Sequence, residues 1–230
     1  SIDMYQGVSL GLGLAYQVTA SPSHRAMLRE LVVTLVRELI KLRPAVPVRV
    51  RHKLLGSWIS SDFTFDVQHA VLVPSEMVDG RVFIQVGTDA DPNDFSASEL
   101  RGVREFFPDF APVLRQLPVV GPALPQIPRP GTAILLAYLM EMALDMTAGL
   151  PASAADRALI QAHYDSQLPT WLPIMKQYAY HHADNCWQQY FGLALVHHST
   201  YGLLRQGGNP PVVAAVRGQV LADKLRPIVA

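Results

Sequence analysis

The 230-residue sequence predicts a mainly α-helical fold, in which antiparallel helical hairpins carry a small antiparallel β insertion. Three observations support this fold class. Apolar residues recur at helical spacing in several long segments. Short segments containing proline and glycine separate them, so consecutive helices are expected to pack antiparallel to each other. Between about residues 46 and 88, apolar residues instead alternate with polar ones, which is typical of half-buried strands.

The first two predicted helices form a hairpin. Asp3 followed by Gln6 is a variant of the capping box, and it predicts a helix that continues to about Thr19. Ser21-Pro22 then supplies an N-cap and a first-turn proline for a second helix. The apolar residues of this second helix recur with helical spacing at Met27, Leu31, Leu35, Leu39 and Leu42.

The stretch from about residue 46 to 88 predicts the small antiparallel β insertion. Two runs alternate apolar with polar residues, and Asp79-Gly80 between them is a turn signal. The alternating positions are Phe63, Phe65, Val67, His69, Val71 and Val73 in the first run, and Val82, Ile84 and Val86 in the second. The insertion is therefore expected to be a small sheet on a helical body.

After the insertion, the sequence predicts one helix and then an ordered crossing. Ser96 and Glu99 form another capping box, which predicts a helix that includes Phe106 and Phe107. Seven prolines lie at positions 108–130, and so many prolines exclude a helix or a central strand. We expect this segment to be ordered and similar to polyproline II, and to cross apolar surface.

Four further helices are expected in the rest of the chain. They are predicted at about residues 131–149, 153–167, 185–205 and 210–224. The gaps between them are short, which favours antiparallel neighbours. Residues 1–230 are therefore expected to form a single helical domain that carries the β insertion and the proline-rich crossing.

Composition excludes several classes of function. Lys and Arg together number 19, as do Asp and Glu, so bulk charge cannot collect nucleic acid or an anionic membrane. The single cysteine, Cys186, excludes an internal disulfide framework and a CxxC zinc site. The longest apolar run, residues 133–150, is interrupted by Glu141 and Asp145, which favours a buried helix over a membrane span.

The beginning of the chain predicts a processed or trimmed product. Ser1 stands where an initiator Met would be expected, and neither a basic region nor a cleavable apolar stretch follows it. A missing N-terminal portion or a partner chain is therefore left open. The compartment is also open, with a periplasmic or secreted location favoured over a cytoplasmic one.

Residues 178–205 contain the side chains most informative for chemistry. Four of the eight histidines lie here, as His181-His182 and His197-His198. On one helix the two pairs would be separated by about 22 Å. Ligands of a single zinc ion all lie within about 2.1 Å of it, so the four histidines cannot share a metal. We therefore expect no metal site.

The first histidine pair precedes a predicted helix start, where backbone N–H groups favour anions. An Asn at such a place can hold a substrate carboxylate, while a His or Tyr moves a proton next to it. The candidate catalytic residues are His182, Asn185 and Tyr190. The candidate substrate-binding residues are Asp3, Tyr5, His181 and Trp187.

A plainer interpretation of the same residues stays open. Asn185 can be an N-cap, with Gln188 three residues on completing the box, and Asp3 can be a cap in the same way. Capping and ligand contact do not exclude each other, because both take place at the mouth of a helix.

Two segments resemble the α/α-toroid architecture of many polysaccharide lyases and glycosidases. They are SIDMYQGVSLGLGLAY at residues 1–16 and HHADNCWQQYFGLALVHHSTYGLLR at residues 181–205. In lyases of that architecture an Asn neutralises the substrate carboxylate while His and Tyr act as base and acid. The resemblance places Asn185, His182 and Tyr190 in these roles. A full toroid has more helices than this chain supplies, so the resemblance implies part of a larger protein or a smaller, partial toroid-like array.

The sequence therefore predicts a carbohydrate-directed enzyme of the polysaccharide lyase or glycoside hydrolase type, or a fragment of one. It would act on a poly- or oligosaccharide at a helix-mouth cleft, without a cofactor, a nucleic-acid partner or a membrane span. The alternative is a non-catalytic helical interaction or scaffold module, in which the same residues are caps and core.

Overall fold

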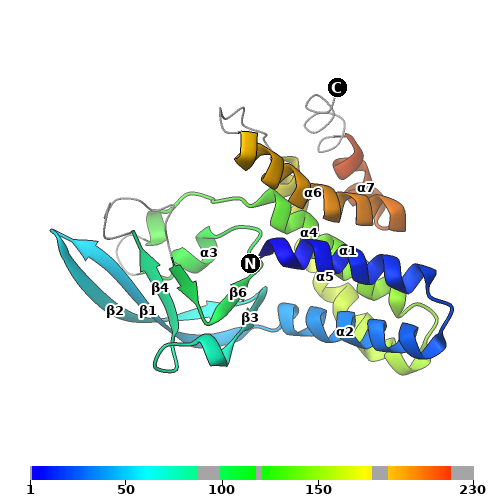
Figure 1. Ribbon diagram of the computed structural model, residues 1–230, viewed down its shortest axis with the longest axis horizontal. Coiled ribbons are helices and arrows are strands. Elements are labelled where there is room, and N and C mark those ends of the chain that lie inside the picture. Colours follow the sequence, from blue (N-terminus) through cyan, green and yellow to red (C-terminus); the bar gives the residue numbers. More distant parts are fainter. Residues whose placement is uncertain (1, 88–98, 118–120, 178–185, 219–230) are drawn as a thin grey trace. The chain divides into compact units, whose positions relative to one another are not determined.

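The computed structural model describes residues 2–87, 99–117, 121–177 and 186–218 (Figure 1). Contacts between residues divide the chain into two compact units. The first, which we call the helical unit, comprises Ser1–Ile40, Phe106–Phe110 and Gln126–Ala230. The second, which we call the sheet unit, comprises Lys41–Glu105 and Ala111–Pro125.

The helical unit is built around one helix, α4 (Pro130–Met146), that is buried along most of its length. Its described α-helices are α1 (Ile2–Val18), α2 (Pro22–Ile40), α4 (Pro130–Met146), α5 (Ala154–Lys176), α6 (Cys186–Gln206) and α7 (Pro210–Ala215), and a 3-10 helix lies at Pro151–Ser153. In α4, 14 of the 17 residues are buried, as expected for a helix surrounded by others. None of the described helices has both the length and the apolar content that a membrane crossing requires.

Helices α1 and α4 run in the same direction. The Tyr138 hydroxyl on α4 donates a hydrogen bond to the Ser9 carbonyl on α1 at 3.4 Å. The Tyr16 hydroxyl on α1 donates to the Met146 carbonyl at the end of α4 at 3.3 Å. Residue numbers therefore rise together along the two helices. By contrast, α5 follows α4 after a short turn and returns antiparallel to it (Figure 1).

Two glycines allow Tyr138 to lie between α1 and α6. A Cβ at Gly13 of α1 would overlap the Tyr138 hydroxyl, and a Cβ at Gly202 of α6 would overlap the Tyr138 ring. Burial raises the pKa of Tyr138 to about 12, so its hydroxyl remains a donor at neutral pH. These contacts fix α4 between its neighbours, one helical turn before Glu141.

Helix α5 is longer than the sequence predicts. It was expected to end near residue 167, but it continues through Pro169 and Pro173 to Lys176. Each proline removes one backbone hydrogen bond from the helix. The last turns nevertheless bury Trp171 and Ile174 almost completely, and this packing offsets the loss.

The sheet unit contains a four-stranded mixed sheet in the order β2-β1-β4-β5 and a two-stranded sheet of β3 and β6. Its elements are β1 (Arg43–Leu54), β2 (Ser57–Val67), β3 (Ala70–Leu72), β4 (Val82–Val86), β5 (Glu99–Arg101), β6 (Val103–Glu105) and α3 (Ala111–Leu114), with 3-10 helices at Pro74–Glu76 and Gly121–Ala123. β1 pairs antiparallel with β2 and parallel with β4. Val48 and Phe65 are among the buried residues of the larger sheet.

The predicted fold class, a mainly α-helical array with a small antiparallel insertion, was wrong. The described residues are 59% helical and 22% strand, which is a mixture of α and β structure. Asp79-Gly80 does form the predicted turn, closed by a bridge between Val78 and Arg81, but β4, which follows it, pairs parallel with β1 rather than antiparallel. The predicted helix after Ser96 is replaced by β5 and β6, whose partners β4 and β3 precede them in the sequence.

The proline-rich segment does not simply cross a surface in an extended form. Its two ends are hydrogen-bonded to each other, since the Phe110 N–H donates to the Ile127 carbonyl at 3.1 Å and the Arg129 N–H to the Pro108 carbonyl at 2.8 Å. Between these ends the chain forms the one-turn helix α3, which the prolines were expected to exclude. Proline is tolerated there because it lies in a first helical turn.

The hairpin of β1 and β2 turns on two residues with positive φ. Leu55 has φ 50° and Gly56 has φ 82°, as a two-residue turn of type I′ requires. Asn, Asp or Gly normally occupies the first of these positions, because a larger side chain is strained in the left-handed region by about 1–2 kcal/mol. Leu55 is nevertheless there, and it is 98% exposed.

Candidate functional site

Most of the predicted site residues lie outside the described part of the chain. His181, His182 and Asn185 belong to residues 178–185, which the structure does not describe, and the same holds for the side chains of Trp187, Tyr190 and Asp3. That these residues converge on one cleft therefore stays a prediction.

Tyr5 is the predicted binding residue whose side chain the structure describes. It is half-buried, and its ring packs edge-on against Phe106, with 4.9 Å between the ring centroids and 80° between the ring planes. The neighbouring Gln6 accepts a hydrogen bond from the Ser199 hydroxyl of α6 at 3.3 Å. The beginning of α1 is thus occupied with packing inside the helical unit.

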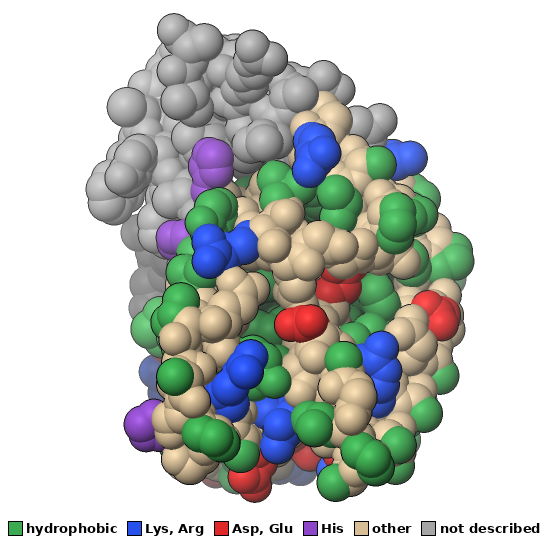
Figure 2. Space-filling view, turned by 90° about the vertical axis from the view of Figure 1, so that its right-hand side faces the viewer, with side chains coloured by type: hydrophobic (Ala, Val, Ile, Leu, Met, Phe, Trp, Pro, Cys, Tyr) green, Lys and Arg blue, Asp and Glu red, His purple; other side chains and the backbone are tan. Residues whose placement is uncertain are grey.

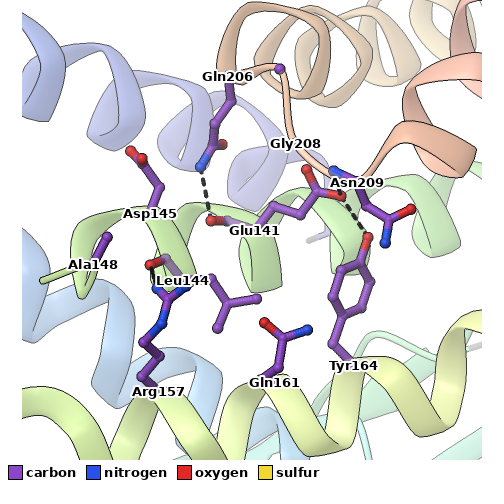
Figure 3. Close-up of a pocket in the computed structure, with 11 residues that line it drawn as sticks. Glu141, Leu144, Asp145, Ala148, Arg157, Gln161, Tyr164, Gln206, Gly208 and Asn209 are labelled. Atoms are coloured by element: carbon purple, nitrogen blue, oxygen red, sulfur yellow. Dashed lines mark hydrogen bonds between the residues drawn. The ribbon is translucent and has the colours of Figure 1, made fainter.

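A separate pocket lies between α4, α5 and the turn from α6 to α7 (Figure 3). Its volume is about 360 Å³. It is lined by Glu141, Leu144, Asp145, Ala148, Arg157, Gln161, Tyr164, Gln206, Gly207, Gly208 and Asn209. Most of these residues carry polar groups, so the pocket is suited to a polar ligand. We call it the Glu141 pocket.

Glu141 is the buried charged side chain of this pocket, with only 5% of its surface exposed. Its Oε1 accepts a hydrogen bond from the Tyr164 hydroxyl at 2.6 Å and another from the Asn209 backbone N–H at 3.1 Å (Figure 3). Its Oε2 is also buried and has no hydrogen-bond partner among the described residues. One oxygen of the carboxyl group is therefore fixed by two hydrogen bonds, and the other is a buried polar atom whose partner is missing among the described residues.

Glycine at position 208 allows the second oxygen to lie directly against the backbone, in the place that a Cβ would occupy. A Cβ at residue 208 would overlap Oε2 of Glu141. Gly207, with φ 68°, ends α6, and its N–H donates to the Leu203 carbonyl at 3.1 Å. Asn209 then caps α7 by accepting from the Val212 N–H at 3.4 Å. The turn Gly207-Gly208-Asn209 thus brings backbone close to the carboxyl group.

The environment of Glu141 favours its protonated form. Burial raises the pKa of Glu141, and the hydrogen bonds from Tyr164 and Asn209 offset only part of this effect. The pKa of Tyr164 is raised by burial and then by the nearby negative charge of Glu141. Tyr164 therefore remains a hydrogen-bond donor. The raised pKa of Glu141 means that its carboxyl group keeps its proton to a higher pH than an exposed glutamate does.

Other residues that line the pocket supply hydrogen-bond donors and acceptors, and Asp145 among them is more exposed than Glu141. Arg157 donates a hydrogen bond to the Leu144 carbonyl, and Gln206 donates to the Glu141 carbonyl at 2.8 Å. Asp145 lies one turn after Glu141 on α4 and is exposed. Figure 2 shows a hollow, with acidic side chains beside it, on a face of the helical unit where acidic and basic groups are mixed.

Among the described residues, no group of three or more His, Cys, Asp or Glu side chains is placed to hold a metal ion. In the second predicted histidine pair, burial and then the positive charge of His198 lower the pKa of His197. Nδ1 of His198 is buried without a hydrogen-bond partner in the described part of the chain.

Sequence reasoning overlooked the Glu141 pocket. In the sequence, Glu141 and Asp145 were interpreted only as charges that interrupt an apolar run. An acidic residue inside such a run is the signal that could have identified the site, because a buried carboxyl group is rare without a specific role.

Comparison with protein-family models, curated proteins and solved structures finds no match to this chain.

The raised pKa of Glu141 predicts that the protein loses stability as the pH rises. Above the ordinary value of 4.5 the folded protein holds this proton more tightly than the unfolded chain does. The free energy of unfolding should therefore fall as the pH rises from 4.5 to the raised pKa of the folded protein, by up to about 1.4 kcal/mol per pH unit. Above that pKa it should level off. Glu141→Gln removes this titration and should become more stable relative to wild type as the pH rises.

Urea denaturation between pH 4.5 and 8.5 measures this difference. Glu30→Gln, which changes an exposed glutamate on α2, is the matched control and should keep the wild-type slope. A constant difference between wild type and Glu141→Gln across this range would contradict the prediction.

Proposed function

We propose that the helical unit binds a hydroxyl-rich ligand of carbohydrate type in the Glu141 pocket, and that the chain is a carbohydrate-directed enzyme or a portion of one. The observation that carries the proposal is Oε2 of Glu141, a buried polar atom without a hydrogen-bond partner among the described residues. Such an atom destabilises a folded protein by about 1–3 kcal/mol. A ligand hydroxyl that reaches it would supply the missing partner.

The composition of the lining supports a sugar rather than a strongly charged ligand. A sugar hydroxyl both donates and accepts, and the pocket offers amides of Gln161 and Gln206, the guanidinium of Arg157 and the carboxylate of Asp145. The volume of about 360 Å³ lies near the lower end of the range for small-molecule sites. This size suits one or two sugar units at most.

Of the two reaction types expected from the sequence, hydrolysis fits this lining better. Hydrolysis of a glycosidic bond uses two carboxyl groups. One of them stays protonated because its pKa is raised, and it acts as the general acid. Glu141 would donate its proton to the leaving oxygen as the bond to the anomeric carbon breaks. Water would add to that carbon and give its proton to Asp145. Both products then carry a hydroxyl group.

This pocket and the predicted helix mouth are separate candidate places. α6 begins at Cys186 and ends at Gln206, so its two ends are about 30 Å apart. The Glu141 pocket adjoins the end at Gln206. His182 and Asn185 precede the other end in the sequence. Variants at Glu141 and at His182 can therefore distinguish the two sites.

The test is a panel of neutral and uronate-containing oligosaccharides, with reducing ends and absorbance of unsaturated uronate as the two readouts. We expect release of reducing ends from at least one neutral sugar, and a loss of about 100-fold or more in rate for Glu141→Gln. Glu30→Gln is the control. The melting temperature of each variant shows that the folded protein is being compared.

Two results would contradict the proposal in different ways. Activity that survives in Glu141→Gln but disappears in His182→Ala would place the chemistry at the helix mouth instead. A protein for which no sugar raises the melting temperature and none is cleaved would be better described as a non-catalytic helical interaction or scaffold module.

A further inference from the structure

The tip of the β1–β2 hairpin combines an exposed apolar apex with cations behind it. The ten residues RHKLLGSWIS, at positions 51–60, contain Arg51, His52 and Lys53 and no acidic residue. Farther from the apex, Arg49 is paired with Asp62 at 2.8 Å and with Asp79 at 2.9 Å. Arg49 is therefore held in ion pairs with acidic side chains, and Arg51 and Lys53 are the arginine and lysine nearest the apex.

The apolar residue at the apex does not contribute to the core of the protein. Leu55 is 98% exposed and occupies a left-handed position that Asn or Gly would adopt with less strain. Ile59, on β2, is a second exposed apolar residue of the hairpin, paired with His52. An exposed apolar residue kept at a strained position indicates a surface that is covered by a partner.

One aromatic side chain connects the apex to the cations. Trp58 pairs with Lys53 across the hairpin, and both lie on the sheet face that carries Arg51. The Arg51 guanidinium lies 4.6 Å from the centre of the Trp58 ring, and the Lys53 ammonium lies 5.6 Å from it. Trp58 thus lies beside Lys53, and Arg51 lies two residues farther from the apex on the same sheet face.

We propose that this hairpin tip, residues 51–59, inserts into the surface of an anionic lipid bilayer. Along a strand, Lys53 lies about 7 Å and Arg51 about 13 Å behind Leu55. An apolar segment buried 5–10 Å in the interface would therefore place these cations at the depth of the lipid phosphates. Tryptophan prefers that same boundary, with its ring half in the apolar region.

Charge complementarity decides which partner the tip fits. The chain has a formal net charge of zero, so attraction to an anionic surface must come from this local cluster. A soluble anionic polymer would use the cations but would leave Leu55 in water. A neutral bilayer would accept the leucine but would not use the cations. Anionic lipid satisfies both.

Cosedimentation with vesicles tests the proposal on the whole chain. Vesicles of phosphatidylcholine alone are compared with vesicles that also contain phosphatidylserine. We expect binding to the anionic vesicles and a blue shift in tryptophan emission. The chain has three tryptophans, so the shift should disappear in Trp58→Phe if Trp58 is the reporter. Soluble glycerophosphoserine should give no shift, because it offers the headgroup without a bilayer.

Two variants separate binding from folding. Leu55→Asn should weaken vesicle binding about tenfold or more, and it should also unfold at a higher urea concentration, because Asn tolerates the left-handed position. Arg51→Glu with Lys53→Glu should remove the preference for anionic vesicles. Leu159→Asn, at a 51% exposed leucine of α5, is the matched control and should bind like wild type.

Three results would overturn the proposal. They are equal binding to neutral and anionic vesicles, binding that Leu55→Asn does not weaken, and binding to a soluble anionic polysaccharide such as heparin without binding to vesicles.

Discussion

Glu141→Ala is expected to lower the free energy of unfolding by about 2–4 kcal/mol. The substitution leaves the Tyr164 hydroxyl and the Asn209 N–H without their common acceptor, and it enlarges the pocket beside α4. Glu141→Gln should behave differently, because an amide oxygen can accept both hydrogen bonds. At pH 7 it should be at least as stable as wild type. Urea denaturation of the three proteins at that pH measures the difference.

The comparison of these two variants also tests how Glu141 is held. Tyr164→Phe removes one donor and should cost about 1 kcal/mol in wild type but much less in Glu141→Ala, since the interaction is already lost there. Equal stability of Glu141→Ala and Glu141→Gln would contradict the hydrogen bonds described for Oε1.

The sequence predicted well those elements that depend on local signals. Ser21-Pro22 and the apolar spacing after it predicted the second helix, and α2 indeed begins at Pro22. The helix predicted at about 185–205 corresponds to α6, Cys186–Gln206. Caps and apolar periodicity lie within a few turns of each other, so one sequence contains the information needed to place such helices.

Strand pairing depends on residues that are far apart, and this part of the prediction failed. The box Ser96–Glu99 is a legitimate local helix signal. It is overruled because Leu100 pairs with Ile84 and Val103 with Leu72, where the extended chain can bury Val103. Intrinsic preference contributes less than such packing. The same limit made the parallel pairing of β1 with β4 unpredictable.

The candidate site was missed for the same physical reason. An apolar run with Glu141 inside it predicts a buried helix, but it does not show which groups meet the carboxyl. Tyr164 lies 23 residues later in the sequence and Asn209 lies 68 residues later. Only the antiparallel return of α5 and the turn after α6 bring them to one oxygen. The chemistry of Glu141 is therefore a property of the packed unit rather than of a motif.

Gly202→Ala is expected to destabilise the protein by about 2–3 kcal/mol. The new methyl group would overlap the Tyr138 ring, which is itself only 2% exposed and cannot move into solvent. Either α6 must shift away from α4 or the ring must leave its position. Both changes would also disturb the turn that places Gly208 and Asn209 beside Glu141. Thermal and urea denaturation measure the effect.

Glycines of α1 provide matched controls for this prediction. Gly13→Ala would overlap the Tyr138 hydroxyl, so Tyr138→Phe should relieve its effect but not that of Gly202→Ala, where the ring itself is in the way. Gly11→Ala has open space around the added methyl and should stabilise α1 by about 0.5–1 kcal/mol. If Gly11→Ala and Gly13→Ala changed the stability equally, Tyr138 would not lie between the two helices as described, and α4 would need another explanation for its fixed position beside α6.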